Sequence, residues 1–519
     1  MKRFRVVFVL GAVVIASLAA TSIHFYQQSV DGQRLFMQVA GIVNSRFVDS
    51  LGASGVYEKA ASGLVEQLHD PYSELMTPKD VEGFARAVEG KYGGIGATVE
   101  SRTGKRTFIT KVYPNTPAEA AGVIEGDQII AVDGVSMVGL EMGDVTSKTK
   151  GDPGTKVNVT FQREGVPEPI TLTLTRALVR IPAVPFAFMA EPGIGYVPLQ
   201  TFNETSAREV TDAVMRLRAE GAKSYVLDMR GNGGGILQQA LAISSLFLKP
   251  KQAIVSVRAR SGVVEADSAM GPRLDGEFPL VVLTDDGSAS ATEIVAGALQ
   301  DHDRALVIGE RSFGKGLVQQ TFPLDGGYLL KVTTGKWYTP SGRSIHRDRT
   351  LRPDGRFVET PVDTVKTPLP RFKSDAGRTV VGGGGIIPDI TVMADTISGP
   401  EQEFLRVTAA QGGLIINALV DEAQRHKAGL APNFTVRPEW LEELNRKLDS
   451  AGVKTEPRMK SARDAVLTRE LDRRLARVAF GDSGQARHDM KNDEQMQRAL
   501  NLLRANNTQS GLLAAAVRR

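Results

Sequence analysis

The 519-residue sequence contains no cysteine and only six histidines, which excludes several kinds of chemistry. Without cysteine there can be no disulfide, no thiolate metal site and no thiol nucleophile. The histidines form neither an H-E-x-x-H pattern nor any other metal-ligand spacing. They are His24, His69, His302, His346, His426 and His488. We therefore expect no metal site and no organic cofactor.

Aromatic residues make up only 6% of the chain, and the net charge is only +4. No basic stripe with interleaved aromatic side chains is found, so we do not expect a nucleic-acid partner. The hydrophobic content of 42% is ample for packed cores. A chain of this length is expected to form several domains.

The N-terminus has the layout of a targeting segment. Lys2, Arg3 and Arg5 precede an uncharged apolar stretch from Val6 to Ala20, as in a secretory signal peptide. Extension of this stretch to Phe25 reaches the length of about 20 residues that a membrane anchor needs. A cleaved signal and an uncleaved tether at residues 6–25 both stay open. Either places the rest of the chain outside the cytoplasm, as a periplasmic or secreted protein.

Two glycine-flanked segments carry the groups best suited to catalysis. The segment Asp286–Glu293 offers hydroxyls on a small-residue turn, and Ser312–Gly316 offers a single lysine. Each follows an apolar run typical of a buried strand, at 280–283 and 305–308. Turns at the ends of neighbouring strands can place a hydroxyl beside an amine. A partly desolvated lysine can then act as the base that activates a serine.

The lysine segment also has a competing interpretation. Residues 309–315 satisfy most of the phosphate-loop pattern G-x-x-x-x-G-K-[ST], but the hydroxyl that should follow is Gly316. A phosphate loop should also open a helix, whereas residues 317–322 and 328–334 are typical of strands. A phosphate-loop nucleotidase is therefore only an alternative.

The stretch from Pro279 to Gln320 resembles the carboxy-terminal processing proteases, also called tail-specific proteases, which are serine peptidases with a Ser–Lys dyad. The resemblance implies that Ser290, the second serine of the Ser-Ala-Ser-Ala run, is the nucleophile. It implies that Lys315 is the general base and that Gln319 orients the lysine.

A second glycine turn lies at residues 231–235, after the strand-like residues 224–230. Glycines let the backbone approach a substrate closely. The turn resembles the family's Asp-Leu-Arg-x-Asn-x-Gly-Gly segment. By that match, the N–H groups of Gly234 and Ala291 form the oxyanion hole. A dinucleotide fingerprint is disfavoured, because position 236 is isoleucine.

A separate module lies upstream. A Gly-x-Gly turn that leaves its N–H groups free can bind a peptide's terminal carboxylate, and the strand after it can pair with the peptide. Together with the loop at 114–123 and the strand and Asp-Gly turn at 126–134, this turn resembles a PDZ domain over residues 86–178. The resemblance implies that the carboxylate-binding residues are Gly93, Gly94, Ile95 and Gly96.

The family resemblance implies an α/β protein: a crotonase-like serine protease core with an inserted, β-rich PDZ domain, to which the sequence adds N-terminal helices and a helical C-terminal extension. The expected segments are a signal peptide or anchor at 1–30, a helical segment at 31–85, the PDZ domain at 86–178, the Ser–Lys protease core at 179–395 and a helical C-terminal domain at 396–519.

The expected activity is that of a serine endopeptidase that cleaves extracytoplasmic proteins near their C-termini. Its expected partners are proteins or peptides with free C-termini, recognised by the PDZ domain. The helical tail is a candidate site for homo-oligomerisation or for an activating partner. A non-catalytic PDZ adaptor on a protease-like scaffold is the main alternative.

Overall fold

The computed structural model describes residues 31–517, with gaps at 103–104, 164–165, 263, 272, 275, 353–356, 360–368 and 395–396. The expected signal peptide or anchor at 1–30 lies outside the described residues. Within them, no helix combines the length and the apolar character needed to cross a membrane.

The chain divides into two compact units. The first contains residues up to Val81, together with Gln319–Thr333 and Arg349–Val358. In it, residues 31–46, the first part of the expected helical segment, are helical. Its other elements are α2 (Gly52–Glu66), β1 (Glu74–Met76), β19 (Arg349–Leu351) and most of the hairpin formed by β17 (Leu317–Pro323) and β18 (Leu329–Tyr338). Within this unit, β1 pairs antiparallel with residues 329–331 of β18 and so joins the hairpin to the N-terminal residues.

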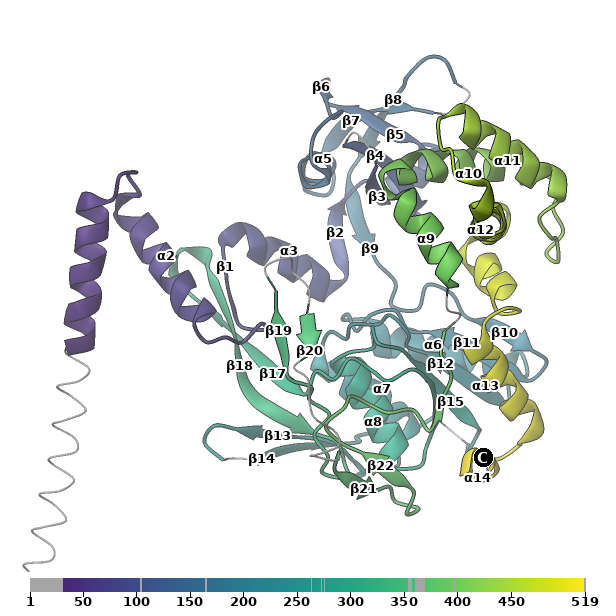
Figure 1. The fold of residues 1–519 in the computed structure, drawn as a ribbon. Coiled ribbons are helices and arrows are strands. Elements are labelled where there is room, and N and C mark those ends of the chain that lie inside the picture. Colours follow the sequence, from purple (N-terminus) through teal and green to yellow (C-terminus); the bar gives the residue numbers. More distant parts are fainter. Residues whose placement is uncertain are drawn as a thin grey trace, which may run out of the picture. The chain divides into compact units, whose positions relative to one another are not determined.

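The second unit is built around a six-stranded sheet with the strand order β10-β11-β12-β15-β16-β23 (Figure 1). The strands from β11 to β23 are parallel, and β10 runs antiparallel to β11. The strands are β10 (Phe188–Glu191), β11 (Ile194–Pro198), β12 (Ser224–Asp228), β15 (Leu280–Thr284), β16 (Leu306–Gly309) and β23 (Ile390–Thr391). The expected buried strands at 280–283 and 305–308 are thus confirmed as β15 and β16.

Both faces of this sheet are buried, which explains why its strands are continuous apolar runs. On β15, Leu280 and Val282 pack with α6, α7 and α8, whereas Val281 and Leu283 point to the opposite face. That opposite face is covered by Met496, Leu500, Leu503 and Leu512 of the C-terminal tail. The helices are α6 (Ser206–Ala219), α7 (Leu237–Phe247), α8 (Ala291–Asp301), α13 (Glu494–Ala505) and α14 (Gln509–Val517). The last 24 described residues therefore complete the core of the sheet.

The module upstream of this sheet has its own core. Its strands have the order β3-β4-β5-β7-β8, with β6 beside β5. They are β3 (Ala97–Arg102), β4 (Arg106–Val112), β5 (Gln128–Val132), β6 (Val135–Ser136), β7 (Lys156–Gln162) and β8 (Ile170–Thr175), with helices α4 (Pro117–Ala120) and α5 (Met142–Thr149). β2 (Lys91–Gly94) pairs with β9 (Ala177–Arg180), so the two ends of the module lie together. Adjacent ends are typical of an inserted domain.

Several further elements complete the described part of the chain. β13 (Ala253–Ala259) pairs with β14 (Val264–Ser268) and with residues 335–338 of β18. The other elements are α3 (Pro78–Glu89), β20 (Phe357–Glu359), β21 (Arg371–Lys373), β22 (Thr379–Val381), α9 (Gly399–Val407), α10 (Gly412–His426), α11 (Pro438–Ser450) and α12 (Lys460–Asp489). The helices α9 to α12 share a separate apolar core. Arg477 of α12 donates to the carbonyl of Thr110 at 2.8 Å, which ties this bundle to β4.

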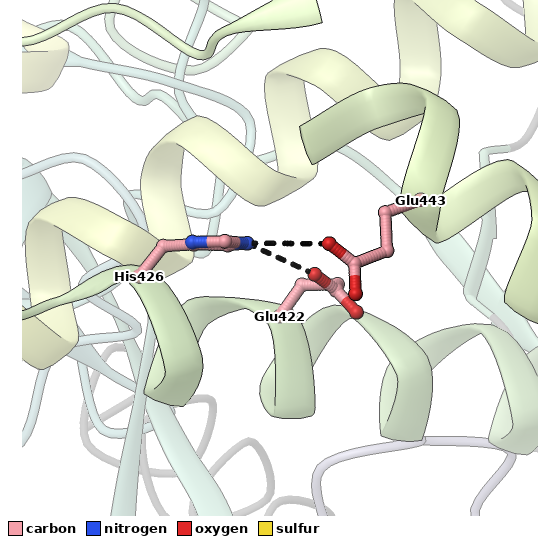
Figure 2. A group of neighbouring side chains, drawn as sticks. All are labelled: Glu422, His426 and Glu443. Atoms are coloured by element: carbon pink, nitrogen blue, oxygen red, sulfur yellow. Dashed lines mark ion pairs between the residues drawn. The ribbon is translucent and has the colours of Figure 1, made fainter. Parts of the chain in front are cut away.

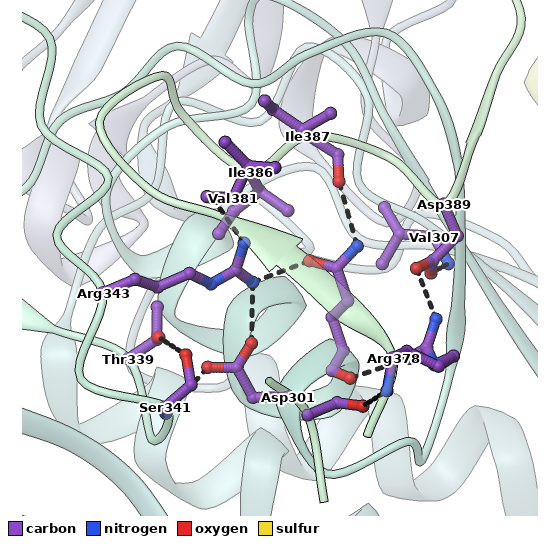
Figure 3. A network of polar contacts seen from close by, with 12 residues as sticks. Asp301, Val307, Thr339, Ser341, Arg343, Arg378, Val381, Ile386, Ile387 and Asp389 are labelled. Carbon is purple, nitrogen blue, oxygen red and sulfur yellow. Dashed lines mark hydrogen bonds and ion pairs between the residues drawn. The ribbon is translucent and has the colours of Figure 1, made fainter. Parts of the chain in front are cut away.

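A buried polar network holds the C-terminal end of α8 (Figure 3). Arg343 donates to Asp301 Oδ1 at 2.8 Å and to Gln300 Oε1 at 2.7 Å, and the side chains of Arg343 and Asp301 are 0% and 1% exposed. Arg343 also donates to the carbonyl of Val381. Arg378, which pairs with Asp389, donates to the carbonyl of Gln300. The loop that follows β18 and the turn between β21 and β22 are thereby fastened to α8.

Candidate active site

Ser290 occupies a sharp turn between a strand and a helix. β15 ends at Thr284, α8 begins at Ala291, and Ser290 has φ 57° and ψ −115°. A non-glycine residue in this backbone region is strained, and strain of this kind accompanies side chains presented for catalysis. Ser288 has a different place: it is fully buried, and its hydroxyl donates to the carbonyl of Met229 at 2.9 Å. Ser288 fastens the turn, and Ser290 is the more accessible of the two serines.

Lys315 lies in the loop that follows the neighbouring strand, β16. The two turns touch, because the N–H of Phe313 donates to the carbonyl of Ser288 at 2.9 Å. The lysine's own backbone is fixed by Trp337, whose indole N–H donates to the carbonyl of Lys315 at 2.9 Å. The loop leads into β17 and not into a helix. It therefore lacks the helix N-terminus on which a phosphate loop depends, and the nucleotidase alternative is not favoured.

Glu293 joins the turns of the serine and the lysine. Its Oε2 accepts the N–H of Ser290 and the N–H of Lys315, each at 2.8 Å. Its Oε1 accepts the hydroxyl of Ser312 and the N–H of Gly314, each at 2.6 Å. Glu293 is 0% exposed. Burial raises the pKa of its carboxyl group above the ordinary value, although these four hydrogen bonds act to lower it.

Local sequence patterns give Glu293 no role beyond that of an acid near the start of a helix, where negative charge is favoured. Its spacing of three residues from Ser290 fits a capping box, in which the acid accepts the N–H of the residue before the helix. The contacts with Ser312, Gly314 and Lys315 come from a segment that follows another strand, and no local pattern predicts them.

The glycine turn at 231–235 packs directly against the serine turn. A Cβ atom on Gly234, which has φ +95°, would lie 2.6 Å from the carbonyl oxygen of Ala289 and 2.9 Å from Ser290 Cβ. Only glycine fits there. The carbonyl of Asn232 accepts the N–H of Ala289 at 3.0 Å and the hydroxyl of Thr292 at 2.8 Å. The structure thus brings Gly234, Ser290 and Ala291 together.

The two expected oxyanion donors differ in their present partners. The N–H of Gly234 donates to Asn232 Oδ1 at 2.9 Å. Ala291 is the first residue of α8, where a backbone N–H has no acceptor within its own helix. An N–H at a helix N-terminus also favours negative charge.

Gln319, the glutamine expected to orient the lysine, belongs to the first compact unit, whereas Ser290 and Lys315 belong to the second. The side-chain N–H of Gln319 donates to the hydroxyl of Thr333 at 3.2 Å, between β17 and β18.

The expected carboxylate-binding loop runs from the last residues of β2 to the residue before β3. Gly93 and Gly94 pair with Leu178 and Ala177 of β9. The carbonyl of Ile95 accepts from Ala118, and the carbonyl of Gly96 accepts from Tyr113. Among the described residues, no acceptor is found for the N–H of Ile95 or of Gly96. β3 is an edge strand next to α5, so a peptide strand can pair with it.

One group of side chains in the described part of the chain has the spacing of a cation site (Figure 2). Glu422 and His426 of α10 lie near Glu443 of α11, with potential ligand atoms within 4.8 Å of one another. Arg425, however, pairs with both carboxylates. The ring of His426 stacks on the ring of Trp440, with the two ring centroids 4.7 Å apart. Since the carboxylates already have a cationic partner, we interpret the group as the ion pair that joins the two helices.

Two families match along the chain. Residues 193–356 match peptidase family S41, and residues 108–163 match the PDZ domain. The carboxy-terminal processing protease CtpA of Bacillus subtilis is 34% identical over 345 residues, which cover 66% of this chain and 71% of that protein. The carboxy-terminal-processing protease of Bartonella bacilliformis is 37% identical over 311 residues, which cover 58% and 70%.

Solved structures are also similar. The photosystem II D1 C-terminal processing protease is 30% identical, with a TM-score of 0.37, over 64% of this chain and 92% of that chain. The PDZ domain of a carboxy-terminal protease from Vibrio cholerae, solved in complex with a peptide, is 32% identical, with a TM-score of 0.16, over 17% of this chain and 98% of that chain.

Proposed function

The chain belongs to the carboxy-terminal processing proteases of peptidase family S41 and is a serine-type peptidase; from this premise we propose that it cuts protein substrates with Ser290 as nucleophile and Lys315 as general base. The observation that carries the proposal is the common acceptor of the two residues, Glu293 Oε2. Two N–H groups that share one oxygen keep the serine turn and the lysine turn at a constant separation. A nucleophile and its base need such a separation to exchange a proton.

In the proposed reaction, the neutral amine of Lys315 takes the hydroxyl proton as Ser290 Oγ attacks the scissile carbonyl carbon. The resulting oxyanion accepts the N–H of Ala291. It also replaces Asn232 Oδ1 as the acceptor of the Gly234 N–H. The ammonium of Lys315 then gives its proton to the leaving amine, and an ester remains on Ser290. Water cleaves that ester, with the lysine again taking the proton. Gln319 keeps the orienting role that the family resemblance implies.

The PDZ module supplies substrate recognition in this proposal. The N–H groups of Ile95 and Gly96 face the terminal carboxylate of the substrate, and Gly93 and Gly94 complete the carboxylate-binding loop. The last residues of the substrate then pair with the free edge of β3. Recognition of a carboxylate by backbone donors requires a free C-terminus.

The proposed cellular location of the enzyme follows from the N-terminal sequence. Residues 1–30 act as a signal peptide or, through residues 6–25, as a tether, and the enzyme works on extracytoplasmic proteins. We keep the helical segment 31–85, the PDZ domain 86–178, the protease core 179–395 and the C-terminal domain 396–519 as proposed domains. The C-terminal domain is also the proposed site for self-association or an activating partner.

Cleavage of a peptide with a free C-terminus tests the proposed chemistry. Ser290→Ala and Lys315→Ala should each abolish cleavage while the circular dichroism spectrum stays that of the native protein. Ser288→Ala should still cleave, although it loses the hydrogen bond to Met229 and some stability. An active Ser290→Ala protein together with an inactive Ser288→Ala protein would show that the nucleophile is wrongly chosen. The adaptor alternative requires that the unmodified protein cleave nothing.

A further inference from the structure

Arg230 lies where β12 passes into the glycine turn, and its side chain is bound first to Asp228 of the same strand. The guanidinium donates through Nε to Asp228 Oδ1 at 2.9 Å and through Nη2 to Oδ2 at 2.6 Å. The hydroxyl of Tyr196 donates to Asp228 Oδ2 at 2.9 Å. Two planar groups joined by two parallel hydrogen bonds have one relative orientation. The free edge of the guanidinium therefore faces a defined direction.

Two residues of the C-terminal tail occupy that edge. Asp493 Oδ2 lies 2.8 Å from Arg230 Nη2, and Gln495 Oε1 accepts from Nη1 at 3.0 Å. Gln495 is only 1% exposed, and its amide N–H donates to the carbonyl of Val392 at 2.8 Å. Burial lowers the pKa of Arg230, but Asp228 and Asp493 outweigh it and raise the pKa above the ordinary value. Arg230 is therefore a cation between two carboxylates, one from the protease strand and one from the tail.

The position of Arg230 matters because the backbone of the next residues can adopt many conformations. Four of the five residues from Gly231 to Gly235 are glycines, which have more backbone freedom than any other residue. Their far end is held against the serine turn by Asn232 and Gly234. Their near end begins at Arg230, and the N–H of Gly231 donates to Asp285 Oδ1 at 2.8 Å. A turn of this kind keeps its shape only when both ends are fixed.

We infer that Asp493 and Gln495 are positioning residues for the reaction. These two residues of the C-terminal tail hold Arg230, Arg230 fixes the start of the glycine turn, and the turn sets the direction in which the Gly234 N–H points. The inference rests on the proposed role of Gly234 as an oxyanion donor. It gives the tail a part in catalysis, although along the sequence the tail lies well outside residues 193–356, which match the peptidase family. An N–H that is out of place stabilises the transition state less, while the substrate binds as before.

The first turn of α13 offers variants that separate this role from folding. Asp493 also accepts the N–H of Met496 as the N-cap of α13, at 3.0 Å. Asp493→Asn and Asp493→Ser both keep an N-capping side chain but remove the carboxylate from Arg230. Glu494→Gln is the matched control: it removes the same charge from an exposed position in the same turn.

The test measures two properties of each full-length variant: kcat and KM on one peptide, and hydrogen exchange of the amides at 231–235. We expect kcat to fall by about tenfold or more in both Asp493 variants, with KM changed by less than about twofold. We also expect faster exchange at 231–235 in both variants, and no change in either property in Glu494→Gln.

The inference is overturned if both Asp493 variants match Glu494→Gln in kcat and exchange. It is also overturned if kcat falls while exchange at 231–235 stays constant, because the tail would then act elsewhere. Should the unmodified protein cleave no peptide, the proposed function fails. The exchange measurement alone then decides whether Asp493 holds the turn.

Discussion

The backbone N–H groups of Ser290 and Lys315 donate to the same oxygen atom, Oε2 of Glu293, at 2.8 Å each. Two such bonds keep the two nitrogens within about 5.6 Å of each other. Ser290 and Lys315 are 25 positions apart and follow different, neighbouring strands. The fully buried carboxylate of Glu293 is the group that binds the backbone of both.

Glu293→Gln tests this common acceptor directly. Glutamine has nearly the same shape, but its amide nitrogen cannot act as an acceptor. It would face either the N–H groups of Ser290 and Lys315, or the hydroxyl of Ser312 and the N–H of Gly314. Each buried donor left without an acceptor costs about 1–3 kcal/mol of stability. We expect a lower urea midpoint and a fall in kcat of about a hundredfold, a size seen when catalytic groups lose their alignment. The control Glu220→Gln alters an exposed ion pair and should change neither property. Native kcat in Glu293→Gln would contradict the role of the carboxylate.

The same residue predicts a pH dependence of stability. Burial raises the pKa of Glu293 in the folded protein above the value of 4.5 expected for the unfolded chain. A carboxyl with a raised folded pKa stabilises the fold most at pH values below its unfolded pKa, and this contribution is lost as the pH rises through the folded pKa. The free energy of unfolding of the native protein should therefore contain a decrease above about pH 4.5 that Glu293→Gln lacks. Urea unfolding of both proteins from pH 4 to pH 8 measures it. Parallel curves would show that the carboxyl does not titrate in this way.

Amidation of the substrate tests the PDZ loop. It removes the terminal negative charge and leaves the scissile region unchanged, so the amidated peptide should have a higher KM and be cut more slowly. Equal cleavage of free and amidated peptides would refute the recognition role of Gly93–Gly96.

The structure also gives the place at which the PDZ module can be removed. β2 pairs with β9, and just outside them the carbonyl of Gly90 accepts the N–H of Ile181 at 2.8 Å. Replacement of residues 91–180 by a short glycine linker should therefore leave the protease sheet folded. If the module delivers substrates, this variant loses activity. If the module blocks the site until a substrate tail displaces it, the variant is active and indifferent to amidation.

Arg343→Leu tests the network at the C-terminal end of α8. The change leaves Asp301 buried without its cation, which costs about 3–5 kcal/mol for an ion pair of this kind. The urea midpoint should fall accordingly, and the double variant with Asp301→Leu should recover part of the loss. Arg458→Leu, which removes an exposed arginine from ion pairs, should leave the midpoint unchanged. A midpoint for Arg343→Leu equal to that of the unmodified protein would show that the network does not hold α8.

Local features of the sequence predicted the strands that lead into and out of the candidate site. The apolar runs at 280–283 and 305–308 became β15 and β16, because a strand buried on both faces must be apolar throughout. The strands after Gly316 were also predicted, which counted against a phosphate loop. Ser288 and Ser290 could be told apart only by the family resemblance. The structure adds a physical difference, since the Ser288 hydroxyl is buried and hydrogen-bonded to Met229.

The sequence by itself determined the turns, the strands and the residue types that chemistry requires, because these depend on neighbours along the chain: glycine where φ is positive, apolar residues where a strand is buried, an acid three residues after Ser290. Only the tertiary structure decided which turns meet. Glu293 reaches Lys315 because β15 and β16 lie side by side, and Asp493 reaches Arg230 because α13 covers the sheet with Met496, Leu500 and Leu503. Those pairings come from the packing of apolar faces, which brings together residues whose separation along the chain carries no information about their distance in space.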